Sequence, residues 1–334
     1  MIRIAVDAMG GDNAPVCNVK GALLALKESP EIDVILVGRE NEIRPLLEGE
    51  VYDKDRLSVI HAEEVIETGE PPAAAIRQKK DSSICVGMRL LKEGQADAFV
   101  SCGSTGALLV GGQLIAGRLP GIRRPALAVL MPTAKGMTLL IDCGANVDAK
   151  PENLVQFAHM GTLYMKYIMH VSDPVVGLAN IGTEEEKGNA LTRETFQLLK
   201  NEPGIRFGGN AEVRDLPAGV CDVCVCEAFT GNVITKMYEG VAKTLFKEIK
   251  AAMMSTVRGK LGGLLVKPSL KKLLKTFDGS EFGGAPLLGL SGLVVKAHGN
   301  SEAVQVKNAV LQCIGFTKND LRDKIVQSMK RDEA

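Results

Sequence analysis

Six short segments of the chain combine glycine with small polar side chains that can bind an anion. They cover residues 7–13, 101–107, 142–146, 180–189, 227–232 and 296–301. Each follows an apolar run typical of a buried strand. Glycine frees backbone N–H groups, and Ser, Thr and Asn add donors, so a set of such loops can hold phosphate. Any single loop can equally be an ordinary strand-to-helix turn with a polar N-cap.

Residues 101–107 are the strongest single phosphate candidate. They pass from a strand into a helix and contain two glycines with four hydroxyl or thiol side chains. The chain has no P-loop, no G-x-G-x-x-G after its first strand, no G-x-S-x-G and no H-E-x-x-H. These absences disfavour nucleotidases, dinucleotide enzymes, serine hydrolases and zinc proteases. A small anion or a phosphate-bearing ligand fits better.

Alternating strand and helix patterns are predicted to position these loops. Short β-branched runs predict strands at 2–6, 34–37, 57–60, 98–100, 126–130, 138–141, 175–178, 220–226 and 293–295. Apolar periodicity predicts helices at 15–27, 82–92, 105–118, 151–169, 192–200, 233–254 and 302–328. The alternation predicts an open, mostly parallel, doubly wound sheet in a single α/β catalytic domain over 1–334. Ligands bind outside the carboxyl ends of such strands, so we expect all six loops on one rim.

Composition excludes several classes of protein. The 334 residues contain 40 Lys plus Arg and 40 Asp plus Glu, a net charge of +0. This balance argues against a nucleic-acid partner bound through a whole-surface positive field. The chain opens on a strand pattern and has no apolar run near the ~18 residues of a spanning helix, so neither a signal peptide nor a transmembrane helix is expected. Eight cysteines are therefore expected to be reduced thiols in the cytoplasm.

Cys221, Cys224 and Cys226 resemble half of a metal site. A zinc site needs more ligands at matching spacing, and the four histidines are scattered along the chain. The cysteines lie in an apolar run, so we interpret them as small hydrophobic residues of a buried strand. Neither a metal nor a cofactor is expected.

Residues 249–277 hold seven basic side chains and no acid, whereas residues 31–70 hold 12 acids and 4 bases. Apolar positions at helical spacing predict a basic amphipathic helical insertion at 249–277, within a helical region near 240–280. Pro268 is expected to separate two stripes, with a new helix starting at Ser269. Packing on the body or at a dimer seam, contact with an anionic membrane and docking of an acidic partner all explain this segment.

The order of the loop motifs resembles one known family. The residues are Asp7-Ala8-Met9-Gly10-Gly11-Asp12, Gly103 with Thr105-Gly106-Ala107, Asp142 with Gly144-Ala145-Asn146-Val147-Asp148, Asn180-Ile181-Gly182 with Glu184 and Lys187-Gly188, Phe229-Thr230-Gly231-Asn232-Val233, and His298-Gly299. In this order they resemble the bacterial phosphate acyltransferases, the acyl-acyl carrier protein:phosphate transacylases of phospholipid synthesis. The resemblance covers residues 2–315.

The resemblance implies that inorganic phosphate attacks the thioester of a fatty acyl-acyl carrier protein. It also implies a homodimer with a three-layer αβα fold similar to isocitrate and isopropylmalate dehydrogenases. The implied enzyme is cytoplasmic and peripherally associated with the inner membrane face, where a glycerol-3-phosphate acyltransferase consumes the acyl phosphate.

Candidate site residues follow from the loops and the resemblance. The candidate catalytic residues are His298, Lys187 and Asn232. The candidate phosphate- or substrate-binding residues are Asp7, Gly10, Gly11, Gly103, Ser104, Thr105, Gly106, Asn146, Asn180, Gly182, Thr230 and Gly231. The candidate contacts with membrane or carrier protein are Arg258, Lys260, Lys267, Leu270, Lys271, Lys272, Leu274 and Lys275.

Direct attack by phosphate needs positioning and oxyanion stabilisation rather than a covalent nucleophile. Lys187 and the Thr and Asn side chains can supply both the positioning and the oxyanion stabilisation. For His298 two roles are expected. It polarises the carbonyl or protonates the leaving sulfur, or it bonds a backbone group at the helix entry. Asp7, Asp12 and Asp142 are expected to orient backbone groups, because carboxylates repel phosphate. Cys102 is not expected to be a nucleophile.

Other functions remain open at this point. A transacylase acting on a short-chain acyl-CoA would use the same chemistry. A decarboxylating dehydrogenase would need NAD and metal-binding aspartates, and an anion sensor would leave the thioester intact.

Overall fold

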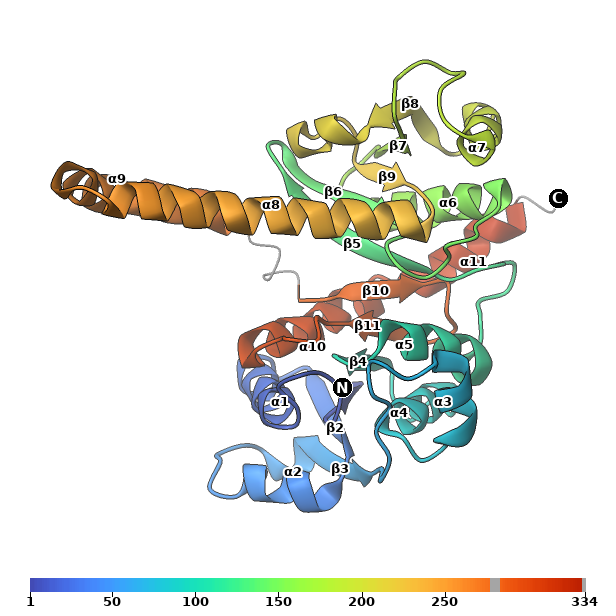
Figure 1. Cartoon of the computed structure of the whole chain (residues 1–334). Helices are drawn as coiled ribbons and strands as arrows, with labels where there is room; N and C mark the ends of the chain where they lie inside the picture. The colour runs from blue at the N-terminus through green and yellow to red at the C-terminus, as the bar shows by residue number, and fades with distance from the viewer. Residues whose placement is uncertain (277–282, 332–334) are drawn as a thin grey trace.

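The computed structural model describes residues 1–276 and 283–331. The described chain forms one 11-stranded sheet in the order β3-β2-β1-β4-β11-β10-β5-β6-β9-β7-β8, with helices on both faces (Figure 1). The strands are β1 (Ile2–Asp7), β2 (Ile32–Gly38), β3 (Leu57–His61), β4 (Ala98–Ser101), β5 (Ala126–Thr133), β6 (Gly136–Ile141), β7 (Val175–Asn180), β8 (Arg206–Glu212), β9 (Val223–Val225), β10 (Ala285–Leu288) and β11 (Leu293–Lys296). The predicted α/β class is confirmed.

The helices connect and cover these strands. They are α1 (Val16–Glu28), α2 (Glu40–Leu47), α3 (Pro72–Gln78), α4 (Ser83–Lys92), α5 (Thr105–Gly111), α6 (Pro151–Tyr167), α7 (Ala190–Lys200), α8 (Ala228–Met254), α9 (Val257–Thr276), α10 (Ala303–Lys318) and α11 (Leu321–Arg331). Short 3-10 helices form at η1 (Lys54–Arg56) and η3 (Val213–Ala218), and a short π-helix forms at η2 (Gly112–Ala116). No helix within residues 1–276 and 283–331 combines the length and apolar character needed to cross a membrane.

The sheet contains two groups of parallel strands. β3, β2, β1, β4 and β11 are parallel to one another, and so are β6, β9, β7 and β8. Between the groups, β10 pairs antiparallel with β11 and β5, and β5 pairs antiparallel with β6. Three successive reversals leave the two groups running in opposite senses. The expectation of one shared rim is therefore wrong: three polar loops follow strands of each group.

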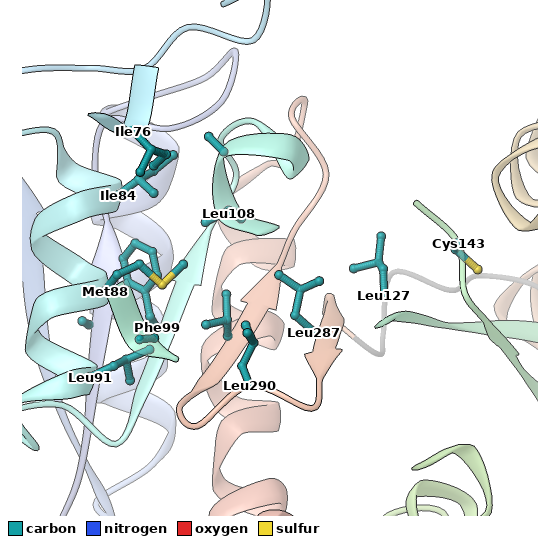
Figure 2. Packing of buried hydrophobic residues seen from close by; sticks show 14 of the residues in the cluster. Ile76, Ile84, Met88, Leu91, Phe99, Leu108, Leu127, Cys143, Leu287 and Leu290 are labelled. Atoms are coloured by element: carbon teal, nitrogen blue, oxygen red, sulfur yellow. The ribbon is translucent and has the colours of Figure 1, made fainter. Parts of the chain in front are cut away.

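Alternate residues of each strand face different helical layers. Ile4 and Val6 of β1 pack in one buried cluster with residues of α1 and α10, while Ala5 packs in another with residues of α4 and α5. Figure 2 shows part of the second cluster, from Met88 and Phe99 to Leu287 and Leu127 at the middle of the sheet. A third cluster lies under α6, α7 and α11. This double coverage explains the near-continuous apolar strands.

Several element predictions differ from the structure. β8 was not predicted, because its residues Arg206-Phe207-Gly208-Gly209-Asn210 contain no apolar run. β8 is an edge strand of the sheet, and an edge strand does not need one. The short β10, α2 and α3 were also missed. The helix predicted at 302–328 is two helices, because Asp320 adopts a left-handed conformation with φ of 49°. The strand predicted at 220–226 is only three residues long, but Cys224 and Cys226 are buried in and beside it as expected.

The predicted helical insertion is a hairpin of α8 and α9 that projects from the body (Figure 1). The predicted break at Pro268 is wrong, since α9 continues through this residue. A proline inside a helix removes one backbone hydrogen bond but need not end the helix. The break lies at Ser255 and Thr256, where the Thr256 hydroxyl accepts a hydrogen bond from Gly259 N at 2.9 Å. Phe277 lies outside the described residues.

Candidate active site

The first loop set comprises residues 7–13, 101–107 and 296–301, which follow the adjacent strands β1, β4 and β11. Asp7 is 1% exposed and joins two of these loops. Its Oδ1 accepts hydrogen bonds from Met9 N at 3.1 Å and Gly10 N at 3.0 Å, and its Oδ2 accepts one from the Ser101 hydroxyl at 2.6 Å. Burial raises the pKa of Asp7, although these donors favour the charged form. The carboxylate organises the loops, as expected from the sequence.

Two glycines let the same loops approach closely. A Cβ on Gly10 would lie 2.7 Å from Gly103 N, and a Cβ on Gly11 would lie 2.8 Å from Gly299 O. Gly11 also has a φ of +97°, which favours glycine. Asp12 N donates to Gly299 O at 2.7 Å. These three loops therefore form one interlocked unit.

Lys296 opens the loop after β11 but was not among the candidate site residues. Its Nζ donates to Cys102 O at 3.3 Å and to Ala297 O, so it links the loops after β4 and β11. Burial lowers the pKa of Lys296, and burial raises the pKa of the neighbouring Cys102 thiol to about 11. A lysine directly at the end of an apolar strand, among glycine loops, was the available signal.

Ser104 acts here as a helix cap. Its Oγ accepts a hydrogen bond from Ala107 N at 3.4 Å at the start of α5. Thr105 and Gly106 are half-buried in the first turn of this helix. The hydroxyl of Ser104 is thus engaged with the backbone of its own loop.

The second loop set comprises residues 142–146, 180–189 and 227–232, which follow β6, β7 and β9. Asp142 is fully buried, and burial raises its pKa. Its carboxylate accepts hydrogen bonds from the backbone N–H groups of Leu127, Gly144, Ala145 and Asn146 at 2.8–3.1 Å, and from Asn146 Nδ2 at 2.7 Å. Asn146 Nδ2 also donates to Pro125 O at 2.7 Å. Asp142 and Asn146 together fix the loop against β5.

The loop after β7 folds around Asn180. The Asn180 side chain accepts from Ile181 N at 2.8 Å and donates to Lys187 O at 3.1 Å. Gly188 has a φ of +94°, and a Cβ there would lie 2.6 Å from Asn180 Oδ1. Gly182 is buried, whereas Ile181 and Lys187 are exposed. The loop thus presents the Lys187 side chain to solvent from an ordered backbone.

The start of α8 is packed against the loop after β6. Glu227 caps the helix by accepting hydrogen bonds from Phe229 N and from Thr230 N and Oγ1. A Cβ on Gly231 would lie 1.9 Å from Asp142 O, so only glycine fits at this contact. Asn146 O accepts from Ala228 N at 3.0 Å. Asn232, one residue beyond Gly231, is exposed.

His298 lies beside the face of α8 that carries Asn232. His298 is 70% exposed, and its Nε2 lies 3.8 Å from Glu239 Oε1. Asn232 and Glu239 are seven residues apart, so they share one face of α8 at a separation of about 10 Å along its axis. His298 belongs to the first loop set and Asn232 to the second, and this face of α8 lies between them. No contact of Lys187 with either residue is seen in the described chain.

The hairpin exposes both charge and apolar surface. Arg258, Lys260 and Lys267 are exposed, and Leu270 is half-buried. Leu261, Leu264 and Leu265 are 62%, 68% and 81% exposed. The predicted contacts Lys271, Lys272, Leu274 and Lys275 fall within α9, where only the backbone is described.

Metal ligands are not gathered anywhere in residues 1–276 and 283–331: these contain no cluster of three His, Cys, Asp or Glu side chains suited to a metal ion.

The fold is shared with a solved phosphotransacetylase from Streptococcus pyogenes. The TM-score is 0.61 at 17% identity, with 95% of this chain and 94% of that one covered. The molecule is thus an α/β protein of the phosphotransacetylase fold, with two sets of glycine-rich loops.

Sequence comparison identifies the family. A family model described as "Fatty acid synthesis protein" matches residues 2–324. A phosphate acyltransferase of Clostridium tetani is 48% identical over 98% of both chains, and one of Clostridium novyi is 49% identical over 97% of both. The chain belongs to the phosphate acyltransferase family of fatty acid synthesis proteins, and it is an acyltransferase.

Proposed function

We propose that the protein transfers a fatty acyl group from acyl-acyl carrier protein to inorganic phosphate, as one catalytic domain. The observation that carries this proposal is that His298 of the first loop set approaches Glu239 of α8, whose exposed face also bears Asn232 of the second loop set. The strand-end carboxylates Asp7 and Asp142 are engaged by backbone N–H groups of their own loops. The names of the relatives support the same acceptor, phosphate.

In the proposed reaction a phosphate oxygen attacks the thioester carbonyl carbon. The new C–O bond forms, the C–S bond breaks, and the carrier-protein sulfur leaves with the bonding pair and takes up a proton. In this proposal Lys187 and Asn232 hold phosphate and stabilise the developing oxyanion. His298 supplies the proton or polarises the carbonyl.

The reaction needs no enzyme nucleophile. Cys102 is 4% exposed, and its thiol, with a pKa of about 11, is protonated near neutral pH. The remaining proposed binding groups are the loop residues Asp7, Gly10, Gly11, Gly103, Ser104, Thr105, Gly106, Asn146, Asn180, Gly182, Thr230 and Gly231. Several of these contribute by fixing loop shape, since the backbone N–H groups of Gly10, Gly103 and Asn146 already donate hydrogen bonds within their own loops.

The decisive experiment incubates palmitoyl-carrier protein with phosphate and measures free thiol and acyl phosphate together. Equal release of both supports the proposal. Thiol release without acyl phosphate identifies a thioesterase, and an intact thioester with bound phosphate identifies an anion sensor. Replacing the carrier protein by acyl-CoA of short chain tests the alternative transacylase, which shares this fold.

We also propose a homodimer formed through α8. Phe229, Val233, Met237, Val241 and Leu245 recur every four residues along α8 and are all more than half exposed. Such i, i+4 ridges pack against the same ridge of a second helix. Val241→Glu should yield monomers in light scattering, whereas Lys243→Glu, an exposed position outside this stripe, should leave the dimer intact. A wild-type monomer contradicts the proposal.

The outer part of the hairpin is proposed to contact anionic lipid at the inner membrane face. Basic residues near anionic headgroups contribute about 1 kcal/mol each, and exposed leucines add apolar burial. Vesicle binding should weaken with salt and with Leu270→Glu, but not with Val51→Glu, which alters an exposed apolar residue on the body. Equal binding by all three proteins contradicts this assignment. A glycerol-3-phosphate acyltransferase would use the acyl phosphate there.

A further inference from the structure

A cavity of about 360 Å³ opens beside the first loop set. Its walls come from the loop after β1, the start of α2 and the segment after β3. Met9 and Gly103 line its buried end, while Glu67 and Thr68 are exposed at its mouth. The cavity therefore leads from solvent to the strand ends at which the proposed reaction takes place.

The charges of the lining limit what can enter. The cavity is lined by three carboxylates, from Asp12, Glu42 and Glu67, and by one cation, Arg39. Arg39 is engaged, since its Nη1 donates to Glu42 Oε1 at 2.9 Å and its Nε donates to Glu63 O at 2.9 Å. Asp12 and Glu67 leave an excess of negative charge, which disfavours an anion. An uncharged ligand with N–H and O–H donors matches these acceptors.

We propose that this cavity holds the pantetheine arm of the thioester donor, an assignment that rests on the proposed function. The arm is an uncharged chain with two amide N–H groups and one hydroxyl that can donate to Asp12 and Glu67. Its sulfur end reaches Gly11 and Gly103 at the buried end, and its anionic phosphodiester remains outside the mouth. Phosphate then attacks the thioester carbon at the buried end, from the side away from the carboxylates of Asp12 and Glu67.

The test narrows the mouth without touching the loops. Thr68→Trp places a large side chain at an exposed position of the lining, and Glu50→Trp is the control at an exposed position outside the cavity. The donors are octanoyl-carrier protein, which has the full arm, and S-octanoyl-N-acetylcysteamine, which lacks most of it. Thr68→Trp should raise KM for octanoyl-carrier protein about tenfold and leave KM for phosphate and kcat/KM for the short thioester within about twofold. Glu50→Trp should match wild type.

A second variant and a binding measurement complete the design. Glu67→Ala removes one acceptor without adding bulk and should raise the same KM by a smaller factor. Calorimetric titration with pantetheine, which needs no turnover, should show binding to wild type and weaker binding to Thr68→Trp.

Equal losses with both donors, a selective rise in KM for phosphate, or unchanged KM for octanoyl-carrier protein would each overturn the assignment. Pantetheine binding without acyl phosphate formation would instead leave the cavity assigned and refute the proposed function.

Discussion

In both loop sets a buried aspartate at the end of an apolar strand accepts hydrogen bonds from backbone N–H groups of the loop that follows. The two aspartates differ in which other part of the chain they join to that loop. Asp7 bonds its own loop and the Ser101 hydroxyl of the next strand, whereas Asp142 bonds its own loop and the start of β5. The first set is consequently interlocked across three loops. In the second set, the loop after β6 contacts the start of α8 at Gly231 and through the Ala228–Asn146 hydrogen bond, while the loop after β7 is ordered by its own hydrogen bonds.

The two lysines differ in the same way. Lys296 of the first set is mostly buried and bonded to carbonyl oxygens, while Lys187 of the second set is exposed. One lysine holds loops together, and the other is available to an anion. Similar local sequences thus produce one set that is mainly framework and another that presents functional groups.

The largest expected effect is on stability. Asp142→Ala removes the acceptor of five hydrogen bonds, and Asp7→Ala removes the acceptor of three. Each buried donor left without an acceptor costs about 1–3 kcal/mol before relaxation. We therefore expect the free energy of unfolding to fall by about 3–5 kcal/mol for Asp142→Ala and by about 2–3 kcal/mol for Asp7→Ala. Urea unfolding measures both. A larger loss of stability for Asp7→Ala than for Asp142→Ala would contradict this ranking by the number of hydrogen bonds accepted.

A second prediction concerns the contact between the loop after β6 and α8. Gly231→Ala places a Cβ 1.9 Å from Asp142 O and should cost about 2–3 kcal/mol in the free energy of unfolding. Gly240→Ala, in the same helix, meets nothing within 4 Å and should stabilise by about 0.5–1 kcal/mol. Unfolding curves of the two variants that coincide would show that α8 is not fixed at Gly231.

Catalytic effects come next in size. Lys187→Ala and His298→Ala should each lower turnover at least tenfold, about 1.4 kcal/mol in activation free energy, with the fold intact because both side chains are exposed. Lys200→Ala is the control, since Lys200 is an exposed lysine paired with Glu185. The assay is acyl phosphate formation at saturating donor. Wild-type rates in either variant would remove that residue from the site.

The smallest expected effect is at Cys102. Cys102→Ala keeps the Cβ that packs near Gly11 and should retain turnover within about threefold. Because burial raises the pKa of this thiol to about 11, the reactive thiolate forms only as the pH approaches that value. Mass spectrometry after iodoacetamide treatment should find Cys102 unmodified at pH 8. Rapid alkylation there, with loss of activity, would reassign Cys102 to catalysis.

Local patterns predicted much of the site but not its layout. The loop motifs, the buried strand around Cys224 and the role of Asp7 and Asp142 as backbone acceptors followed from residue type and neighbours, and the structure confirms them. The shared rim was wrong, because pairing of β10 and β5 is a long-range choice. Lys296 was missed for a similar reason: its carbonyl partner at Cys102 is 194 residues away in sequence.

The sequence by itself determined the alternation of strands and helices, the glycine loops at strand ends and the basic hairpin segment, because each depends on side chains close together in the chain. Only the tertiary structure decided that these loops divide into two sets on oppositely directed strand groups, that His298 meets Glu239 of α8, and that a polar cavity opens beside Gly11 and Gly103. These outcomes depend on strand order and on the packing of segments that are distant in the sequence. Local residue preferences do not encode either of them.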